Sequence, residues 1–392
     1  MVAPRVFYNL AHTITIILPL FFCLPSMSLN YELQNKLRAI AIYLPQFHPT
    51  PENDEWWGKG FTEWTNVAKA TPRFPGHYQP QLPSDLGFYD LRVAETRQAQ
   101  ADMARQYGIE GFCYYHYWFN GRRILERPFE EVLKSGQPDF PFCLCWANEN
   151  WTRRWDGSDE QILLKQEYGE DDDREHLRSL AAAFADPRYI RVDGKPVFIV
   201  YRTHLLPNVQ RTVETWRDEA HRLGIGELYL MRMNGWGPHP DPHELGFDAA
   251  VEFQPDWVSL PGRQYGDVKT RGLNKLGLKP SPYLQDEIRE YDDVVKAMLA
   301  REKPGYKLYP GITPAWDNSA RRKKNAVIIT NSTPEKYEAW LRNIVQSFKP
   351  YSANENFIFI NAWNEWAEGN HLEPCQRWGR QYLEATARAL KT

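Results

Sequence analysis

Two glutamates three residues apart, Glu365 and Glu368, follow directly after the apolar run 357–360. The surrounding segment 361–371 adds amides, indoles and an imidazole. Acidic side chains are seldom fully buried without a partner, whereas breaking a glycosidic bond usually needs two carboxyl groups with different tasks. Indole faces suit the apolar side of a sugar ring. The segment therefore predicts carbohydrate chemistry at a strand end, and the alternative is a pair of exposed loop acids.

The local backbone decides whether the two carboxyl groups can work together. If the strand continued through Glu365, alternation would turn Glu365 and Glu368 to opposite faces. A turn after Glu365 would change that, because Cβ atoms three residues apart at helical spacing lie about 5–6 Å apart. Gly369 favours such a turn.

The segments 147–151 and 363–366 share one theme, in which an amide and a carboxylate stand beside an indole. The amide can hold a sugar hydroxyl, and a tryptophan wall raises the pKa of a neighbouring acid, as a general acid at neutral pH requires. The residues predicted to bind or act in these segments are Asn148, Glu149, Trp151, Asn364, Glu365 and Trp366.

Composition points to a globular protein that handles glycans. The chain has 392 residues, 42% hydrophobic and 25% charged, which allows one large barrel or two ordinary domains. Its net charge of -3 argues against a nucleic-acid surface. Many of its 15 Trp and 21 Tyr stand beside Asn, Glu, Asp or His, which favours a carbohydrate groove over a purely apolar pocket.

The five cysteines are expected to be buried thiols, and Cys143 and Cys145 are too close along a strand to pair with each other. A cysteine nucleophile or a zinc site is the alternative, but neither CxxC nor HExxH occurs. No metal or cofactor is predicted.

Apolar runs of strand length recur from residue 38 onward, and most precede a helical pattern. Helices are expected at 91–107 and 209–223, each ending at a glycine, and from Thr333 to about Phe348. Eight alternations predict an α/β fold, a single (β/α)8 TIM-type barrel with long βα-loop insertions. A doubly wound sheet is the alternative, although no GxGxxG follows a strand. The eight predicted strands are 39–47, 111–118, 140–148, 196–201, 228–234, 249–253, 308–314 and 357–363.

The domain prediction is an apolar segment 1–29 followed by one catalytic domain, 30–392. Residues 14–25 have the length of a signal-peptide core, but Pro19 and Pro25 interrupt them and Met27 could be the true start. The chain is thus exported or membrane-anchored if 1–26 is a signal segment, and otherwise cytoplasmic.

In a barrel, the polar residues that close each strand should converge on one cavity at the C-terminal face. A single His or Tyr among them could equally be a packing residue. The further predicted substrate contacts are His48, Tyr115, His116, Trp118, Tyr201, Asn234, Glu252, Trp316, Asp317 and His371.

A basic run, 321–324, follows the seventh strand, where barrels often carry a phosphate site. Arg321 could bind an anionic sugar there, and a solvated basic loop is the alternative. A DxD pattern at 171–173 could hold a metal-bound nucleotide sugar, but it fits better as the acidic first turn of a helix.

Five motifs together resemble the glycoside hydrolase family 99-like domain, a family also catalogued as glycosyltransferase WbsX. They span 41–67, 111–119, 145–157, 314–322 and 361–374, and the resemblance covers about residues 38–390. It implies a (β/α)8 carbohydrate-active enzyme whose two catalytic glutamates sit three apart, at Glu365 and Glu368.

The resemblance also implies distinct roles for the pair. Glu365 would deprotonate the substrate's own 2-hydroxyl, which attacks the anomeric carbon to give a 1,2-anhydro sugar, and Glu368 would be the general acid and then base. The chain departs from family 99 proper at Ala367, where a His is usual, and at Cys375, where relatives commonly carry an acid. Mannose specificity therefore does not carry over.

Three functions follow in order of preference. The first is a retaining glycoside hydrolase that acts on an α-linked glycan or a bacterial surface polysaccharide. The second is a glycosyltransferase of O-antigen, capsule or exopolysaccharide synthesis, and the third is a non-catalytic glycan-binding barrel. The expected partner is an oligosaccharide or polysaccharide, with no nucleic acid, and with a membrane only through the N-terminal segment.

Overall fold

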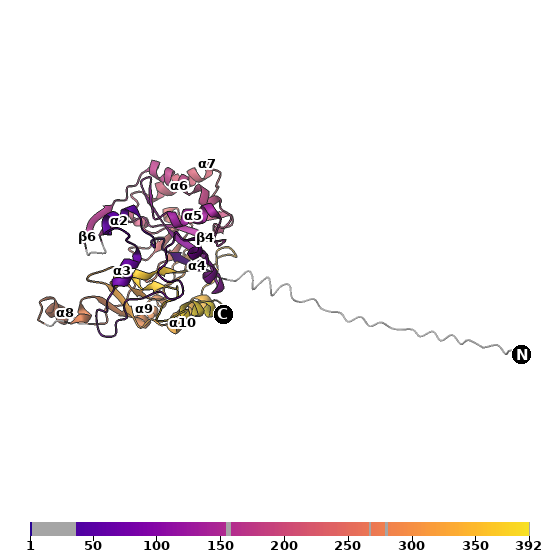
Figure 1. Cartoon of the computed structure of the whole chain (residues 1–392). Coiled ribbons are helices and arrows are strands. Elements are labelled where there is room, and N and C mark those ends of the chain that lie inside the picture. The colour runs from indigo at the N-terminus through magenta and orange to yellow at the C-terminus, as the bar shows by residue number, and fades with distance from the viewer. Residues whose placement is uncertain (2–36, 154–157, 266–267, 279–280, 392) are drawn as a thin grey trace. The chain divides into compact units, whose positions relative to one another are not determined.

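The computed structural model describes Met1 and residues 37–391, without 154–157, 266–267 and 279–280 (Figure 1). From Leu37 onward the chain forms one compact unit. The predicted signal or anchor segment, 1–29, lies outside the described residues apart from Met1. Within the described ranges, no helix has both the length and the apolar character needed to cross a bilayer.

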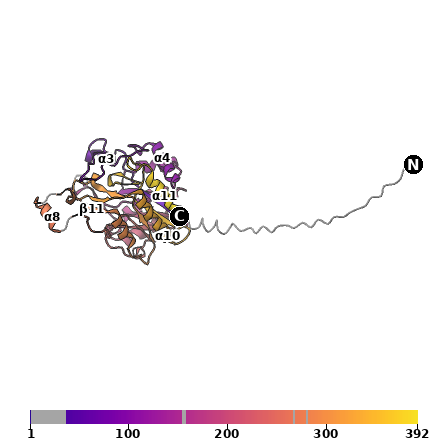
Figure 2. The same cartoon turned by 90° about the horizontal axis from the view of Figure 1, so that it is seen from below.

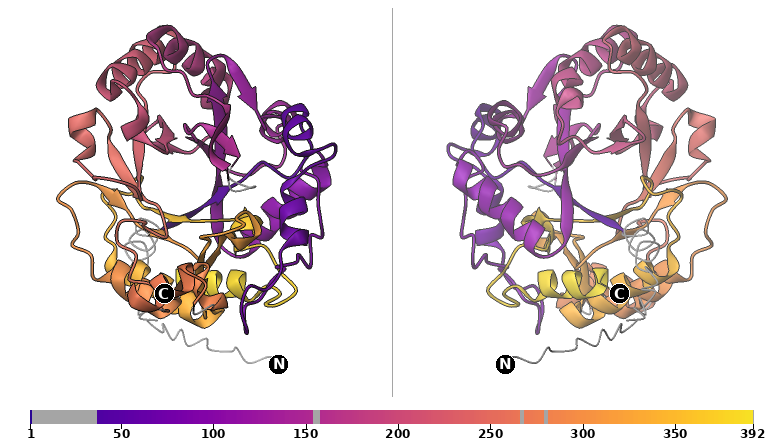
Figure 3. Two further views of the ribbon diagram at one scale, coloured as in Figure 1. Left: turned by 90° about the vertical axis from the view of Figure 1, so that its left-hand side faces the viewer. Right: turned by 90° about the vertical axis from the view of Figure 1, so that its right-hand side faces the viewer.

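The core is a closed ring of parallel strands, which Figure 3 shows nearly end-on. Every neighbouring pair in the ring is parallel, and only Pro310 separates its two terminal strands, so one stretch of chain closes the ring. All eight predicted strands are present, and the predicted TIM-type barrel is confirmed. Around the ring lie β12 (Leu308–Tyr309), β10 (Ala249–Glu252), β9 (Tyr229–Asn234), β8 (Lys195–Val200), β4 (Phe142–Trp146), β2 (Ile109–Phe119), β1 (Arg38–Tyr43), β16 (Phe357–Ile360) and β13 (Gly311–Ile312).

The strands read as continuous apolar runs because both faces are covered. All four residues of β16 and all five of β4 are buried, for example. The seventh strand, predicted as one run over 308–314, is split into β12 and β13 at Pro310. Gly311 permits this closure, since a Cβ there would lie 2.0 Å from the Glu252 carbonyl oxygen.

Helices surround the ring, as Figures 1 and 3 show. The helix predicted over 91–107 begins later, at Ala94, while those predicted from 209 and after Thr333 are found with small shifts at their ends. The connection between β9 and β10 holds only a short 3-10 helix. The outer elements are α4 (Ala94–Gln106), α5 (Arg127–Ser135), α6 (Glu170–Ala185), α7 (Val209–Arg222), η3 (Pro242–Leu245), α9 (Tyr291–Leu299), α10 (Pro334–Ser347) and α11 (Gln381–Leu390).

The long connections that leave the C-terminal ends of strands carry structure of their own. In Figures 1 and 2, α8 stands apart from the barrel at the edge of the molecule. These additions are α2 (Pro51–Trp57), α3 (Glu63–Lys69), β5 (Trp151–Arg153), β6 (Ser158–Leu164), η2 (Thr203–Leu205), α8 (Val268–Lys275), η4 (Pro282–Leu284), β11 (Glu287–Glu290), β14 (Trp316–Asp317), η5 (Asn318–Ala320), β15 (Val327–Thr330), β17 (Asn364–Glu365), η6 (Trp366–Glu368) and β18 (Asn370–His371). Two short strands, β3 (Arg122–Ile124) and β7 (Arg191–Val192), pair with β2 and β8.

Candidate active site

The chain turns directly after Glu365, as the sequence allows. Glu365 ends β17, the 3-10 helix η6 follows, and Gly369 closes the turn with a φ of 57°. A side chain at Gly369 would be strained, because the φ is positive and a Cβ would lie 3.2 Å from the Asp317 backbone nitrogen. This turn lets the carboxyl groups of Glu365 and Glu368 reach the same cation.

That cation is Arg321, whose guanidinium binds three carboxylates at once. Its Nη2 lies 2.9 Å from Glu365 Oε2, and its Nη1 lies 2.8 Å from Glu368 Oε1. Its Nε donates to Oε1 of Glu63 at 2.6 Å. The side chains of Glu63, Glu365 and Glu368 are 0%, 7% and 20% exposed. Three carboxyl groups thus share one positive charge in a mostly dehydrated place.

Burial shifts the pKa values of these groups in the direction that acid–base catalysis needs. Burial raises the pKa of Glu365 to about 8, and Glu368 and Glu63 add to that rise while Arg321 opposes it. Burial also raises the pKa of Glu368, again against Arg321. Burial alone would lower the pKa of Arg321, but the three carboxylates raise it. The pair therefore titrates together, and near neutral pH it holds a proton.

The two glutamates line a cleft of about 630 Å³ at the C-terminal ends of the strands. Residues that follow seven of the eight strands contribute to its wall, and β2 contributes Tyr115 and Tyr117 from within the strand, as expected for a barrel. The predicted site residues that line it are Tyr115, Glu149, Trp151, Tyr201, Trp316, Arg321, Glu365 and Glu368.

Aromatic rings run in a continuous series along this cleft. Tyr115 meets Tyr201 edge to face at 5.7 Å, and Tyr201 lies 4.5 Å from Trp236. Farther along, Trp257 meets Trp316 edge to face at 5.0 Å. Tyr201, Trp236 and Trp257 are half-buried and leave apolar area for the flat faces of sugar rings, while glutamates, asparagines and arginines of the cleft can bind hydroxyls.

Two predicted asparagines do not line the cleft but fix the backbone around it. Asn364 accepts from Leu44 N at 2.8 Å and donates to Leu44 O at 3.0 Å, which ties β17 to the end of β1. Asn148 makes the same pair of hydrogen bonds with the backbone of Arg202: its Oδ1 accepts from the Arg202 nitrogen at 2.8 Å, and its Nδ2 donates to the Arg202 carbonyl at 2.9 Å. Arg202 in turn pairs with Glu149 at 2.7 Å, so this amide positions a carboxylate that does line the cleft.

Trp366 and His371 are likewise buried supports of the turn. Their rings stack with centroids 3.7 Å apart. The Trp366 indole donates to Glu373 at 2.7 Å, and His371 is bonded to the Glu373 carbonyl and to Gln81. Burial raises the pKa of Glu373 to about 7. These buried side chains fix the position of η6 without lining the cleft, whereas Glu365 and Glu368 line it.

Asp317 is buried beneath the cleft and caps the short helix η5. Its Oδ1 accepts from Ser319 N at 3.0 Å, and its Oδ2 lies 2.7 Å from both His77 and Gln79. Arg321 follows directly at the end of η5. Asp317 therefore orients the segment that carries Arg321.

His116 and Trp118 point away from the cleft, because side chains alternate along β2 and Tyr115 and Tyr117 take the inner face. The Nε2 atoms of His116 and His176 lie 3.0 Å apart, within hydrogen-bond distance. Burial lowers the pKa of His116 to about 3. The Trp118 indole donates to Asp172 at 2.9 Å. The expectation that these two residues reach the cleft is wrong.

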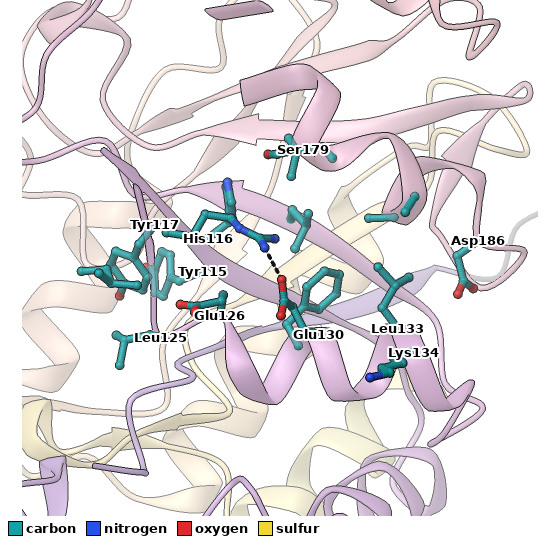
Figure 4. A pocket seen from close by; sticks show the side chains of 17 residues that line it. Tyr115, His116, Tyr117, Leu125, Glu126, Glu130, Leu133, Lys134, Ser179 and Asp186 are labelled. Carbon is teal, nitrogen blue, oxygen red and sulfur yellow. Dashed lines mark hydrogen bonds and ion pairs between the residues drawn. The ribbon is translucent and has the colours of Figure 1, made fainter. Parts of the chain in front are cut away.

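Figure 4 shows the cavity that His116 does line, between α5 and α6 on the outside of the barrel. It measures about 560 Å³, and most of its interior is apolar. The interaction drawn in Figure 4 joins Arg123 to Glu130 at its rim. The Glu365 and Glu368 pair does not line this cavity, so it is not the candidate active site.

Three other predicted contacts also lie outside the cleft. His48 is buried, and burial lowers its pKa to about 4. The Asn234 amide donates to the Tyr306 hydroxyl at 3.2 Å. Glu252 pairs with Arg301 at 2.5 Å and accepts from Gly311 N, which secures the split seventh strand.

A substitution at His116 distinguishes packing from substrate contact. We expect His116→Phe to lower the free energy of unfolding by about 1–3 kcal/mol, because His176 loses its partner in a buried place. Tyr115→Phe, one residue away on the inner face, should barely change stability but should alter KM or kcat on a glycan substrate. Urea unfolding and steady-state kinetics of both variants test this, and a KM change confined to His116→Phe would contradict it.

Several residues of the cleft were missed from the sequence. Trp57 comes from the insertion that follows β1, and Trp257 and Glu287 come from the insertion that follows β10. Glu63, from the same insertion as Trp57, was also missed; it does not line the cleft but is buried against Arg321. Tyr117 was passed over on the inner face of β2. The motif over 41–67 was a usable signal for Trp57 and Glu63, because it joins indoles and acids, but nothing in it says that Trp57 lines the cleft or that Glu63 binds Arg321.

The DxD pattern at 171–173 has the structural role that was favoured for it. These residues form the acidic first turn of α6. Asp172 accepts from Trp118, and Asp173 accepts from the Thr212 hydroxyl at 2.8 Å. Both carboxylates are thus engaged in packing α6 against its neighbours.

One family model matches most of the chain, and curated relatives match about the same length of it. The family model described as "Glycosyltransferase WbsX" matches residues 39–386. The protein described as "Uncharacterized protein WxcX" from Xanthomonas campestris pv. campestris is 44% identical over 352 residues, which is 90% of this chain and 49% of that protein. The chain therefore spans about half the length of the curated relatives that it matches.

Solved structures with the same fold are glycoside hydrolases by description. The GH99 endo-alpha-mannosidase of Bacteroides thetaiotaomicron superposes with a TM-score of 0.53 at 14% identity, over 90% of this chain and 96% of that one. A structure described as a "Glycoside hydrolase-like protein" gives a TM-score of 0.52 at 14% identity, over 91% and 95%. At this identity the likeness establishes the barrel fold.

Proposed function

The chain belongs to the family described as "Glycosyltransferase WbsX", and from that premise we propose that it is a carbohydrate-active enzyme that cleaves an α-linked glycan or surface polysaccharide with retention of configuration. The observation that carries this proposal is the Glu365 and Glu368 pair, joined by one guanidinium on the wall of an aromatic cleft. Two carboxyl groups with raised pKa values are what proton transfer to and from sugar oxygens requires.

In the reacting form, the proton held by the pair lies on Glu368 and Glu365 is ionised. In the first step, the Glu365 carboxylate takes the proton of the sugar's 2-hydroxyl, and the freed oxygen attacks the anomeric carbon. The bond to the leaving oxygen breaks, and that oxygen takes the proton of Glu368. In the second step, Glu368 takes a proton from water, the water oxygen attacks the anomeric carbon and opens the 1,2-anhydro ring, and Glu365 returns its proton to the 2-oxygen. Both residues regain their starting state, and two inversions give net retention.

The experiment that tests the function is a product analysis. The protein is incubated with a defined panel of α-linked mannans and bacterial surface polysaccharides, and products are identified by mass spectrometry. NMR of the first product formed reports the anomeric configuration. We expect shorter glycans with retained configuration. Inverted products, or no cleavage of any glycan in the panel that binds, would contradict the proposal.

The family's own description favours a second candidate, a glycosyltransferase that uses the same cleft with a sugar acceptor in place of water. Asp172 and Asp173 already accept hydrogen bonds from protein donors, which argues against a metal-bound nucleotide sugar at the DxD pattern. Thermal shifts with nucleotide sugars plus Mg²⁺ or Mn²⁺, absent with oligosaccharides, would favour the transferase over the hydrolase.

The aromatic wall makes a separate prediction about affinity. Trp151 and Trp257 line the cleft and are half-buried, so each has ring area left for a sugar. We expect Trp151→Ala and Trp257→Ala each to raise KM about tenfold, the effect of losing roughly 1.4 kcal/mol of stacking, with a smaller change in kcat. Trp378→Ala, at a half-buried tryptophan away from the cleft, is the matched control. Equal KM values in all three variants and the wild type would show that these rings do not bind substrate.

A further inference from the structure

The third carboxylate on Arg321 comes from a distant part of the chain. Glu63 is the first residue of α3, and its Oε1 accepts from Arg321 Nε at 2.6 Å. Its side chain is fully buried, and its second oxygen, Oε2, has no hydrogen-bond partner among the described residues. A buried carboxylate is tolerated only with such a charged partner. The contact therefore fixes the positions of both side chains, Glu63 and Arg321.

The guanidinium has three nitrogens, and each serves a different carboxylate. Because the group is planar and rigid, fixing Nε at Glu63 also fixes the directions of Nη1 and Nη2. Those two nitrogens meet Glu368 and Glu365. The three elements that bear these residues, α3, the end of η5 and η6, also pack on one another.

The charge balance, like the geometry, couples Glu63 to the Glu365 and Glu368 pair. One arginine cannot neutralise three buried carboxylates, so one carboxyl group of the set is best protonated. Glu63 uses part of the arginine's charge, so Glu365 and Glu368 have less than one positive charge between them to balance two carboxylates. If Glu63 were neutral, Arg321 could stabilise both members of the pair as anions, and the proton needed by the general acid would leave at lower pH.

We propose that Glu63 is the positioning residue of this active site: acting through Arg321, it fixes the carboxyl groups of Glu365 and Glu368 and keeps one proton on that pair. The inference rests on the proposed function for its meaning in catalysis, while the charge coupling itself stands on the contacts. It assigns a purpose to Glu63, one of the acids of the motif over 41–67, which the chemistry of the pair alone does not use.

Other titratable or charged groups face the same place and must be separated from Glu63 in the test. Tyr115 and Tyr117 neighbour the pair from β2, Tyr201 neighbours it from the end of β8, and Arg322 lies near Glu368. Glu149 is matched by Arg202 at 2.7 Å. Glu287 also lines the cleft but is bound by Arg263 and Arg289 and not by Arg321.

The test compares pH profiles of kcat/KM for the wild type, Glu63→Gln and Glu287→Gln on one cleaved glycan. Glu63→Gln keeps the shape and loses the charge. We expect its alkaline limb to move to lower pH by about one unit or more, because a negative charge beside the pair has been removed. In Glu287→Gln the limb should stay within a few tenths of a unit. Equal shifts in both variants would show a general field of the cleft and would overturn the proposal.

A second variant separates charge from position. Glu63→Asp keeps the charge but is too short to reach Arg321 Nε in the same geometry. We expect its alkaline limb to stay near that of the wild type while kcat falls at least tenfold with KM less affected. A kcat equal to that of the wild type would remove the positioning role.

The coupling can also be measured without turnover. Carboxyl carbons labelled with ¹³C at glutamate Cδ are titrated by NMR in the wild type, with Glu365→Gln and Glu368→Gln to assign the pair, and in Glu63→Gln. We expect the upper titration of the pair to fall in Glu63→Gln. That shift in a protein that cleaves no glycan would refute the proposed function alone, and an unchanged titration in an active enzyme would refute the role of Glu63 alone.

Discussion

Glu365→Gln and Glu368→Gln are each expected to lower kcat about 10³-fold or more while the protein stays folded. The loss follows from the roles proposed for the pair, since an amide can neither take the proton of a sugar hydroxyl nor donate one to a leaving oxygen with useful driving force. Each glutamine can still bond to Arg321, so the cleft keeps its shape.

Steady-state kinetics and thermal unfolding of the two variants provide the measurement. Glu355→Gln is a suitable control, because Glu355 is also a buried carboxylate with a cationic partner, Lys307, but it precedes β16 and lies outside the cleft. It should lose stability and keep its turnover. If either Glu365→Gln or Glu368→Gln turned over at the wild-type rate, the assignment of the catalytic pair would be wrong.

The same substitution at Glu365 is expected to make the protein more stable in alkaline solution. Burial raises the pKa of Glu365 in the folded state to about 8, from an ordinary value of 4.5. Its contribution is fully present below about pH 4.5 and is lost as pH rises from there through 8, because over this range the unfolded chain releases the proton while the folded state still holds it. At about 1.4 kcal/mol per pKa unit, the loss amounts to a few kcal/mol.

The prediction concerns the difference between two stability curves. Other buried groups also titrate, such as Glu373 with its raised pKa and His371 with its lowered pKa, but they are common to both proteins. The free energy of unfolding of Glu365→Gln minus that of the wild type should therefore rise between pH 4.5 and 8 and level off above. Urea titrations at several pH values give this curve. A flat difference would mean that Glu365 is ionised freely in the folded state.

A rising difference would show that the ionised Glu365 carboxylate lowers the free energy of unfolding. A charge that destabilises the fold at the working pH is retained in enzymes where chemistry needs it, and active sites are where strongly shifted pKa values gather.

The architecture could be predicted from the sequence because it depends on regular patterns. Apolar runs at strand length, such as 140–146, and helices with marked ends, such as the one that begins after Thr333, reflect local preferences and burial. The barrel then sets where strand ends meet, so the convergence of Tyr201, Trp316 and Glu365 on one cleft also followed.

The directions in which single side chains point were harder to predict, because a shift of one residue along a strand moves a side chain to the opposite face. His116 and Tyr115 are neighbours with similar chemistry, yet one packs against α6 and the other lines the cleft. Asparagines of the motifs, such as Asn364, turned to the backbone because a strand end leaves polar groups that must be paired.

By itself, the sequence determined the barrel, the place of the Glu365 and Glu368 pair and the turn that joins them, since these follow from periodicity, spacing and one glycine. Only the tertiary structure decided what surrounds the pair. Glu63 and Arg321 are brought to it by loops from the first and seventh strands, and loop paths depend on packing between distant segments, which no local pattern encodes. The charge balance that sets the chemistry of this site is therefore a property of the fold.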